Sequence, residues 1–291
     1  MPESASPQQE QQPVRESFGS RLAAAMAARG PLCVGIDPHP QLLADWGLTD
    51  DAAGLERFSL TVVEAVASLA AAVKPQVALY ERHGSAGMAA LERTLAACAE
   101  AGVLSIADAK RGDIGSTMAA YADAWLRDGS SLAADSVTLS PYLGFESLRP
   151  ALDLAAQYGR GVFVLALTSN PEGKSVQHVG GGDSVARRMV AAAAAENQRY
   201  QGVLGSVGLV VGATIGSALE DLDINLAPVR GAILAPGLGA QGATPADLRA
   251  TFGHAYPSVL ATSSRGILAA GPSLASLRAA TAETLDGLRS E

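Results

Sequence analysis

The sequence predicts an α/β fold, specifically a (β/α)8 TIM barrel built as a single domain. Eight short, almost continuously apolar segments recur along the 291 residues, and helical segments separate them. Strands that are apolar on both faces are typical of parallel sheets covered by helices on both sides. Eight such units in a chain of this length fit a closed barrel. An open doubly wound sheet is the alternative, but it lacks support because no G-x-G-x-x-G follows the first apolar segment.

The apolar segments are the predicted barrel strands. They span residues 32–37, 71–75, 104–110, 136–141, 162–169, 208–214, 231–237 and 258–266. The predicted helices span residues 17–29, 55–70, 87–101, 118–125, 145–158, 184–201, 217–221, 244–252 and 273–288. Residues 1–14 are polar and rich in Gln, Ser and Pro, which predicts a disordered tail before a catalytic domain at 15–291.

Composition excludes several classes of function. The formal net charge is −8 with no basic tract, which argues against nucleic acid or an anionic membrane surface as a partner. No apolar run reaches membrane-spanning length, and the first residues lack the apolar core of a signal peptide. The two cysteines, Cys33 and Cys98, are predicted to be buried free thiols, which indicates a reducing cytoplasm. No cysteine–histidine cluster has metal-ligand spacing.

The segment 107–117, A-D-A-K-R-G-D-I-G-S-T, places two carboxylates and one ammonium group at the end of the third predicted strand. Because side chains alternate along a strand, Asp108 and Lys110 are expected to point the same way. Asp113 follows Gly112 and is expected to be the N-cap of the next helix. A strand-end salt bridge with an ordinary cap would explain this motif equally well. The residues at the other strand ends therefore decide between a structural and a catalytic role.

Charged and polar residues also end other predicted strands. These residues are Asp37, Lys74, Ser140, Ser169 and Arg265. The C-terminal ends of barrel strands form the face on which barrel enzymes carry their active sites. Solvated surface is a poor explanation for charges at the ends of strands one, two, three and eight, so we expect an active site there.

The loops after strands seven and eight predict a phosphate site. The first contains P-G-L-G-A-Q-G from Pro236, and the second contains S-S-R-G with Arg265. Barrels often bind phosphate between these two loops. Glycines let backbone N–H groups approach an anion, and arginine pairs with phosphate in a bidentate manner. A flexible glycine loop beside a structural arginine is the alternative, but the position in the barrel favours phosphate.

Five motifs, in order along the chain, together resemble the orotidine 5′-phosphate decarboxylase family. They are G-I-D-P with Asp37, V-K-P with Lys74, D-A-K-R-G-D-I-G-S-T, P-G-L-G-A-Q-G and the S-R-G of strand eight. The long third motif and K-P-Q-V-A-L-Y-E are similar to the bacterial subgroup with longer loops. The resemblance implies decarboxylation of orotidine 5′-phosphate to uridine 5′-phosphate and carbon dioxide, the last step of de novo pyrimidine synthesis, without metal or cofactor.

The resemblance also implies roles for individual residues. It implies a catalytic array of alternating lysines and aspartates: Lys74, Asp108, Lys110 and Asp113. In the family the last aspartate reaches into the neighbouring subunit's site, which implies a homodimer with shared sites and Ile114 and Thr117 at the shared edge. The implied ligand contacts are Asp37 and Lys74 with the ribose hydroxyls, Ser169 with the pyrimidine amide, and Pro236, Gln241 and Arg265 with the phosphate. Residues 170–183 form a longer loop with no assigned roles.

The chemistry of this reaction explains why a lysine between aspartates is useful. Loss of carbon dioxide from C6 of the pyrimidine leaves a poorly delocalised carbanion, and no cofactor that could accept the electrons is indicated. A fixed ammonium group must stabilise that charge and then donate a proton, and Lys110 is the candidate. Opposite charges about 4 Å apart attract by roughly 4 kcal/mol at an effective dielectric constant of 20. The neighbouring carboxylates of Asp108 and Asp113 favour the ammonium form.

Three other readings are open. Barrels of the hexulose-phosphate synthase type share D-x-K-x-x-D but use magnesium and an acidic residue at the end of strand two, where this chain has Lys74. A Schiff-base aldolase needs a readily neutral lysine, and a lysine between two aspartates is the opposite. A phosphosugar-binding sensor or scaffold is the non-enzymatic reading. The four histidines, His39, His83, His178 and His254, are predicted to pack in loops or near helix ends.

Overall fold

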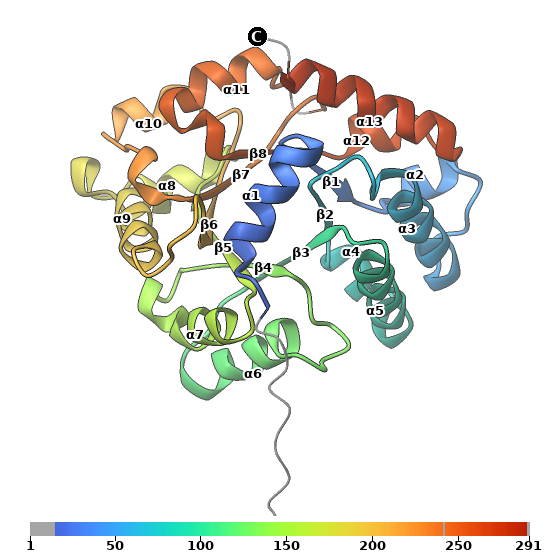
Figure 1. Cartoon of the computed structure of the whole chain (residues 1–291), viewed down its shortest axis with the longest axis horizontal. Coiled ribbons are helices and arrows are strands. Elements are labelled where there is room, and N and C mark those ends of the chain that lie inside the picture. Colours follow the sequence, from blue (N-terminus) through green and yellow to red (C-terminus); the bar gives the residue numbers. More distant parts are fainter. Residues whose placement is uncertain (1–14, 241, 290–291) are drawn as a thin grey trace, which may run out of the picture.

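The computed structural model describes residues 15–240 and 242–289 and shows a closed barrel of eight parallel strands. Each strand pairs with the next along the chain, and β8 pairs with β1 to close the ring. Helices surround the strands (Figure 1). The prediction of a (β/α)8 barrel is confirmed. The predicted tail at residues 1–14 lies outside the described residues.

The strands are β1 (Leu32–Ile36), β2 (Ala72–Pro75), β3 (Leu104–Arg111), β4 (Ser136–Leu139), β5 (Gly161–Leu167), β6 (Gly205–Val211), β7 (Gly231–Pro236) and β8 (Val259–Ser263). The helices are α1 (Phe18–Arg29), α2 (Pro40–Asp45), α3 (Ala52–Val66), α4 (Ala78–Glu81), α5 (Gly84–Glu100), α6 (Gly115–Leu126), α7 (Arg149–Gln157), α8 (Lys174–Gln177), α9 (Val185–Asn197), α10 (Ala218–Asp221), α11 (Pro245–Phe252), α12 (Arg265–Leu268) and α13 (Leu274–Arg289). Short 3₁₀ turns lie at Phe145–Leu148, Pro171–Gly173, Gly181–Asp183, Ala227–Val229 and Gly253–Ser258.

Several boundaries differ from the predicted ones. β4, β5, β6 and β8 end two or three residues earlier than predicted, because the chain leaves the ladder to form the loops at the barrel mouth. The helix after β3 begins at Gly115 with Ile114 as its N-cap residue and without a side-chain cap. The N-cap prediction for Asp113 is therefore wrong. Its carboxylate instead accepts the N–H of the next residue, Ile114, at 2.7 Å.

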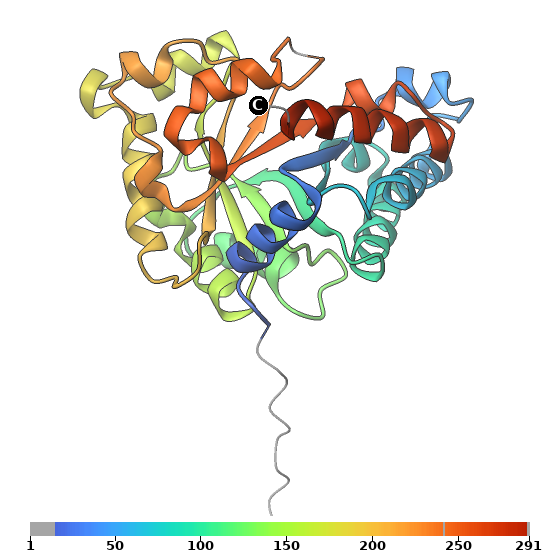
Figure 2. The ribbon, with the colours of Figure 1, turned by 45° about the horizontal axis from the view of Figure 1, so that its top comes forward.

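Helix α1 closes the N-terminal end of the barrel. Figures 1 and 2 show it lying across that end. Phe18 packs edge-on against Phe163 of β5, with ring centroids 5.9 Å apart, and both side chains are buried. Gly161 makes this approach possible, because a Cβ there would lie 2.2 Å from the Phe18 ring. Helix α1 therefore covers the centre of the N-terminal end of the barrel.

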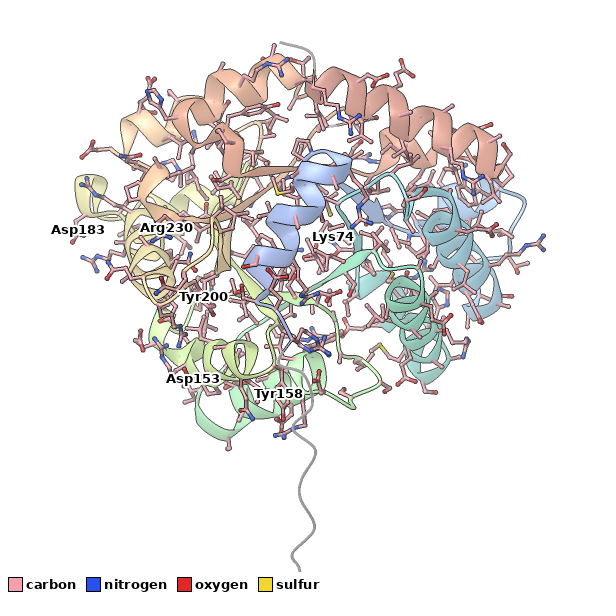
Figure 3. The ribbon with its side chains drawn as sticks, viewed as in Figure 1. Lys74, Asp153, Tyr158, Asp183, Tyr200 and Arg230 are labelled. Carbon is pink, nitrogen blue, oxygen red and sulfur yellow. The ribbon has the colours of Figure 1, made fainter. Side chains whose placement is uncertain are left out.

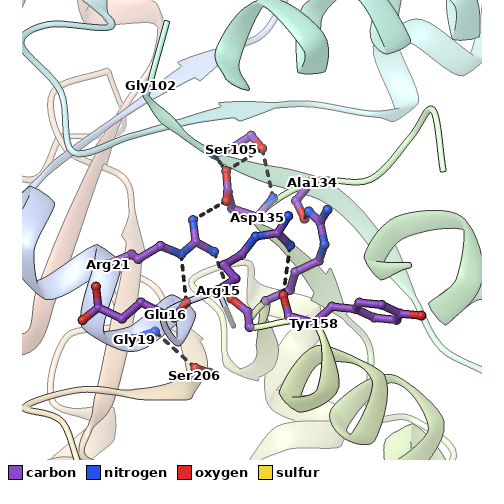
Figure 4. Close-up of polar contacts among 12 residues, drawn as sticks. Arg15, Glu16, Gly19, Arg21, Gly102, Ser105, Ala134, Asp135, Tyr158 and Ser206 are labelled. Carbon is purple, nitrogen blue, oxygen red and sulfur yellow. Dashed lines mark hydrogen bonds and ion pairs between the residues drawn. The ribbon is translucent and has the colours of Figure 1, made fainter. Parts of the chain in front are cut away.

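Polar contacts fasten α1 to the strands. Arg21 donates to Asp135 Oδ1 at 2.5 Å and to the Gly159 carbonyl at 2.9 Å. The other carboxylate oxygen of Asp135 accepts the backbone N–H of Ser105, at the start of β3, at 3.0 Å (Figure 4). Arg21, directly and through Asp135, thus joins α1 to the N-terminal ends of β3, β4 and β5. The helix is held by an ion pair as well as by apolar packing.

The cysteine prediction is confirmed: Cys33 and Cys98 are both buried free thiols. Burial raises the pKa of each thiol to about 12, so both are protonated near neutral pH. Across residues 15–240 and 242–289, no helix combines the length and the apolarity needed to cross a membrane.

Candidate active site

A cavity of about 320 Å³ opens at the C-terminal ends of the strands. Six residues singled out in the sequence line it: Asp37, Lys74, Asp108, Lys110, Pro236 and Arg265. They come from the ends of β1, β2, β3, β7 and β8 and the loops that follow. Figure 3 shows Lys74 inside the ring of helices. The barrel therefore brings together charges that lie far apart in the sequence.

Asp108 lies between two ammonium groups. Lys74 Nζ donates to Asp108 Oδ2 at 2.8 Å, and Lys110 Nζ donates to Asp108 Oδ1 at 2.6 Å. The side chains of Lys74 and Asp108 are each 8% exposed, whereas that of Lys110 is 45% exposed. The first pair is a buried anchor, and Lys110 faces the cavity where a ligand can reach it.

The positions of Asp108 and Lys74 determine the charge states of both side chains. Burial alone would raise the pKa of Asp108, but Lys74 and Lys110 outweigh burial and hold the pKa well below its usual range. Burial would lower the pKa of Lys74, but Asp108 and Asp37 outweigh it and raise the pKa above its ordinary value. Asp108 and Lys74 are therefore both charged near neutral pH. Removing one of them would leave the other as an uncompensated buried charge.

The expected same-side placement of Asp108 and Lys110 is confirmed by their direct contact. Regular strand alternation does not produce it, because Lys110 has a φ of +48° and the β3–β4 register shifts between Ala107 and Arg111.

Two neighbouring side chains complete the surroundings of Asp108. Thr138 Oγ1 lies 2.9 Å from Asp108 Oδ1. The Gln76 amide, turned with its nitrogen toward Asp108, donates to Oδ2 at 2.9 Å.

Asp37 offers a hydrogen-bond acceptor to a ligand. Its Oδ2 accepts from the hydroxyl of Ser264. Its Oδ1 is buried without a hydrogen-bond partner among the described residues, as is the hydroxyl oxygen of Thr262 in the same cavity. Buried polar atoms are rarely left unsatisfied, so these two indicate a hydroxyl-bearing ligand.

The part of the cavity formed by the loops after β7 and β8 is suited to an anion. Pro236, Gly237 and Leu238 line it from the loop after β7, and Arg265 lines it from the start of α12. Within the described part of the chain, the exposed Arg265 side chain makes no hydrogen bond and no ion pair, so its guanidinium group is free to bind. Gln241 lies outside the described residues, and its assignment to phosphate stays a prediction.

Four other candidate residues do not line the cavity. Three of them lie in the first turn of α6 or just before it: Asp113, Ile114 and Thr117. The Ile114 side chain is 62% exposed. Ser169 is also exposed, and its neighbour Thr168 lines the cavity instead. Gln177 of α8 holds Thr168: the Thr168 N–H donates to Gln177 Oε1 at 2.8 Å, and Gln177 Nε2 donates to Thr168 Oγ1 at 2.7 Å.

Sequence reasoning missed several lining residues: His39, Gln76, Thr138, Thr168, Thr262 and Ser264. His39 was expected to be ordinary loop packing. A two-residue period was the available signal for Gln76, which follows Lys74 at i+2 and therefore faces the same way. Within the two described ranges, no group of three or more His, Cys, Asp or Glu side chains is arranged to hold a metal ion.

Residues 30–280 match the model of the family described as orotidine 5′-phosphate decarboxylase / HUMPS. The chain belongs to this family. It is 58% identical over 268 residues to the orotidine 5′-phosphate decarboxylase of Streptomyces coelicolor, covering 91% of this chain and 94% of that protein. A Streptomyces avermitilis crystal structure assigned to the same activity matches with a TM-score of 0.90 at 56% identity, covering 95% and 96%. The Leishmania donovani OMP decarboxylase structure matches with a TM-score of 0.74 at 32% identity, covering 94% and 97%.

Proposed function

We propose that this chain decarboxylates orotidine 5′-phosphate to uridine 5′-phosphate and carbon dioxide, the last step of uridine 5′-phosphate synthesis. The observation that carries the proposal is the charged array of Lys74, Asp108 and Lys110 in one cavity with Arg265, whose guanidinium group has no polar partner among the described residues. Membership of the family and the names of relatives 58% identical support the same reaction. The hexulose-phosphate synthase alternative is disfavoured, because Lys74 is a buried cation where that class needs a metal-binding carboxylate.

The geometry explains how the reaction proceeds. Breaking the C6–carboxylate bond leaves an electron pair on C6, and Lys110, the exposed ammonium of the array, can face that atom. Its charge stabilises the carbanion as it forms, and its proton then completes the product. Asp108 faces the same space as a fixed anion. A substrate carboxylate next to it is repelled, and this repulsion disappears when carbon dioxide leaves.

We assign the contacts with the ribose, the phosphate and the pyrimidine amide to residues in or near the same cavity. Asp37 Oδ1, buried and unpaired among the described residues, and Lys74 bind the ribose hydroxyls. Pro236, Gln241 and Arg265 bind the phosphate. Ser169 binds the pyrimidine amide after the loop that contains α8 closes over the ligand, which would bring this exposed side chain to the cavity.

We further propose a homodimer in which Asp113 completes the partner subunit's site. Asp113, Ile114 and Thr117 do not line the cavity of their own chain, so they are available to another. Large exposed apolar side chains support an interface on this face: Ile114 is 62%, Tyr142 79% and Leu143 54% exposed. They follow β3 and β4 on the side of the barrel that carries the cavity.

We propose that the reaction needs neither metal nor cofactor, and that it takes place in the cytoplasm. The two protonated free thiols are consistent with a reducing compartment. The test of the function is the loss of pyrimidine absorbance when purified protein is incubated with orotidine 5′-phosphate, with and without a metal chelator. Equal rates in both samples support the proposal. No turnover in either overturns the function, and loss of turnover with chelator overturns metal independence.

Phosphate binding leads to a specific expectation for Arg265→Ala. Loss of an arginine–phosphate hydrogen-bonded pair should lower kcat/KM for orotidine 5′-phosphate about 10- to 150-fold. The phosphate-free nucleoside should lose far less. Part of the loss should appear in kcat, because phosphate binding energy also drives loop closure. Arg278→Ala is the control, because this exposed arginine of α13 donates to the Glu64 carbonyl and does not line the cavity. Equal losses for nucleotide and nucleoside would contradict the assignment.

A further inference from the structure

The end of β3 contains an irregularity opposite one residue of β4. Ala107 pairs with Val137 and Arg111 pairs with Leu139, so three residues of β3 lie opposite the single residue Thr138. Extra residues in one strand of a pair form a bulge, which re-aims side chains and leaves backbone groups without their usual partners. The three residues of this bulge include Asp108 and Lys110, the two charged groups of this strand that line the cavity.

Lys110 adopts a backbone conformation that side-chain-bearing residues seldom take. Its φ is +48°, in the left-handed region. A residue stays there only when surrounding contacts hold it. The contact at its backbone comes from Thr138, because the Lys110 N–H donates to Thr138 Oγ1 at 2.9 Å.

The same hydroxyl also contacts the carboxylate. Thr138 Oγ1 donates to Asp108 Oδ1 at 2.9 Å. The hydroxyl oxygen accepts from the Lys110 N–H, so its single proton is free to point at Asp108. Thr138 is 1% exposed, and water therefore does not compete for either bond. One buried hydroxyl joins the backbone of Lys110 to the side chain of Asp108.

We propose that Thr138 is a positioning residue for the decarboxylation. It holds the bulge so that the Lys110 ammonium and the Asp108 carboxylate keep their relative placement while charge develops at C6. This inference rests on the proposed function. It adds a residue with no charge of its own, which acts through Lys110 and Asp108.

A positioning role predicts a particular kinetic pattern. Thr138→Val keeps the branched shape but leaves the Lys110 N–H and one Asp108 lone pair without their partner. We expect kcat to fall about 10- to 100-fold, the loss of a hydrogen bond of one to a few kcal/mol, with KM changed less than about threefold. Affinity for a nucleotide with an ionised oxygen at C6 should fall by a similar factor, and affinity for uridine 5′-phosphate should change little.

The chain provides matched variants for the test. Thr138→Ser keeps the hydroxyl and should retain kcat within about threefold of the unsubstituted protein. Ser136→Ala removes another buried hydroxyl from the same face of β4, one that has no hydrogen-bond partner among the described residues, and should leave kcat unchanged. Thermal unfolding of all variants reports stability separately. Should Thr138→Val fail to fold, Thr138→Ala removes the hydroxyl without added bulk and is judged by the same criteria.

The outcomes separate this inference from the proposed function. An unsubstituted protein that does not turn over orotidine 5′-phosphate overturns the function. An active protein whose folded Thr138→Val or Thr138→Ala variant keeps its kcat overturns the positioning role alone. Equal losses of affinity for the anionic nucleotide and for uridine 5′-phosphate also overturn it, because a general structural defect would produce that pattern.

Discussion

Lys110→Ala is expected to abolish measurable turnover of orotidine 5′-phosphate, with a loss of kcat of about 10⁴-fold or more. The substitution removes both the cation that faces the developing carbanion and the proton donor, and each effect alone is worth about 10²-fold or more. The barrel should still fold, because the Lys110 side chain is 45% exposed at the barrel mouth and Asp108 keeps its buried partner Lys74. Steady-state kinetics and thermal unfolding of the same preparation measure the two effects.

Ligand binding to the Lys110→Ala protein distinguishes transition-state stabilisation from ordinary binding. A nucleotide with an ionised oxygen at C6 places negative charge where the carbanion forms, whereas the product uridine 5′-phosphate does not. The anionic ligand should therefore lose far more affinity than the product. If calorimetry finds equal losses for both ligands, Lys110 binds the ground state and the proposed mechanism is wrong.

Mixing Lys110→Ala subunits with Asp113→Ala subunits should restore activity that neither variant has alone. If Asp113 acts in the partner subunit's site, each heterodimer contains one site with both residues intact. With free exchange of equal amounts, half of the dimers are heterodimers, so recovery should approach about a quarter of the unsubstituted activity. The activity of the mixture over time, compared with each variant alone, measures this effect.

The absence of Asp113 from its own chain's cavity is the observation behind this expectation. Subunit exchange must be shown independently, for example by co-purification of differently tagged subunits. A mixture of each variant with itself is the control for simple reactivation. If exchange is demonstrated and activity does not return, Asp113 acts within its own chain and the shared-site proposal fails.

Local sequence patterns predicted most of the architecture. The apolar segments predicted all eight strands, because a strand covered on both faces must be apolar whatever its partner. The charges at strand ends predicted the face of the site, since a parallel barrel gathers all C-terminal strand ends on one side. The same-side placement of Asp108 and Lys110 was also predicted, but the irregularity of β3, and not the strand alternation behind the prediction, produces it.

The tertiary structure decided how those charges are held. Thr138 contacts Asp108 and Lys110 because three residues of β3 lie opposite one residue of β4. No local sequence pattern predicts that shift in register. The closure of the other end by Phe18 likewise depends on the space that Gly161 leaves beneath it. The sequence by itself determined which residues carry charge and on which face they lie. Their exact partners depend on contacts between segments far apart in the chain, which only the closed barrel brings within hydrogen-bonding distance.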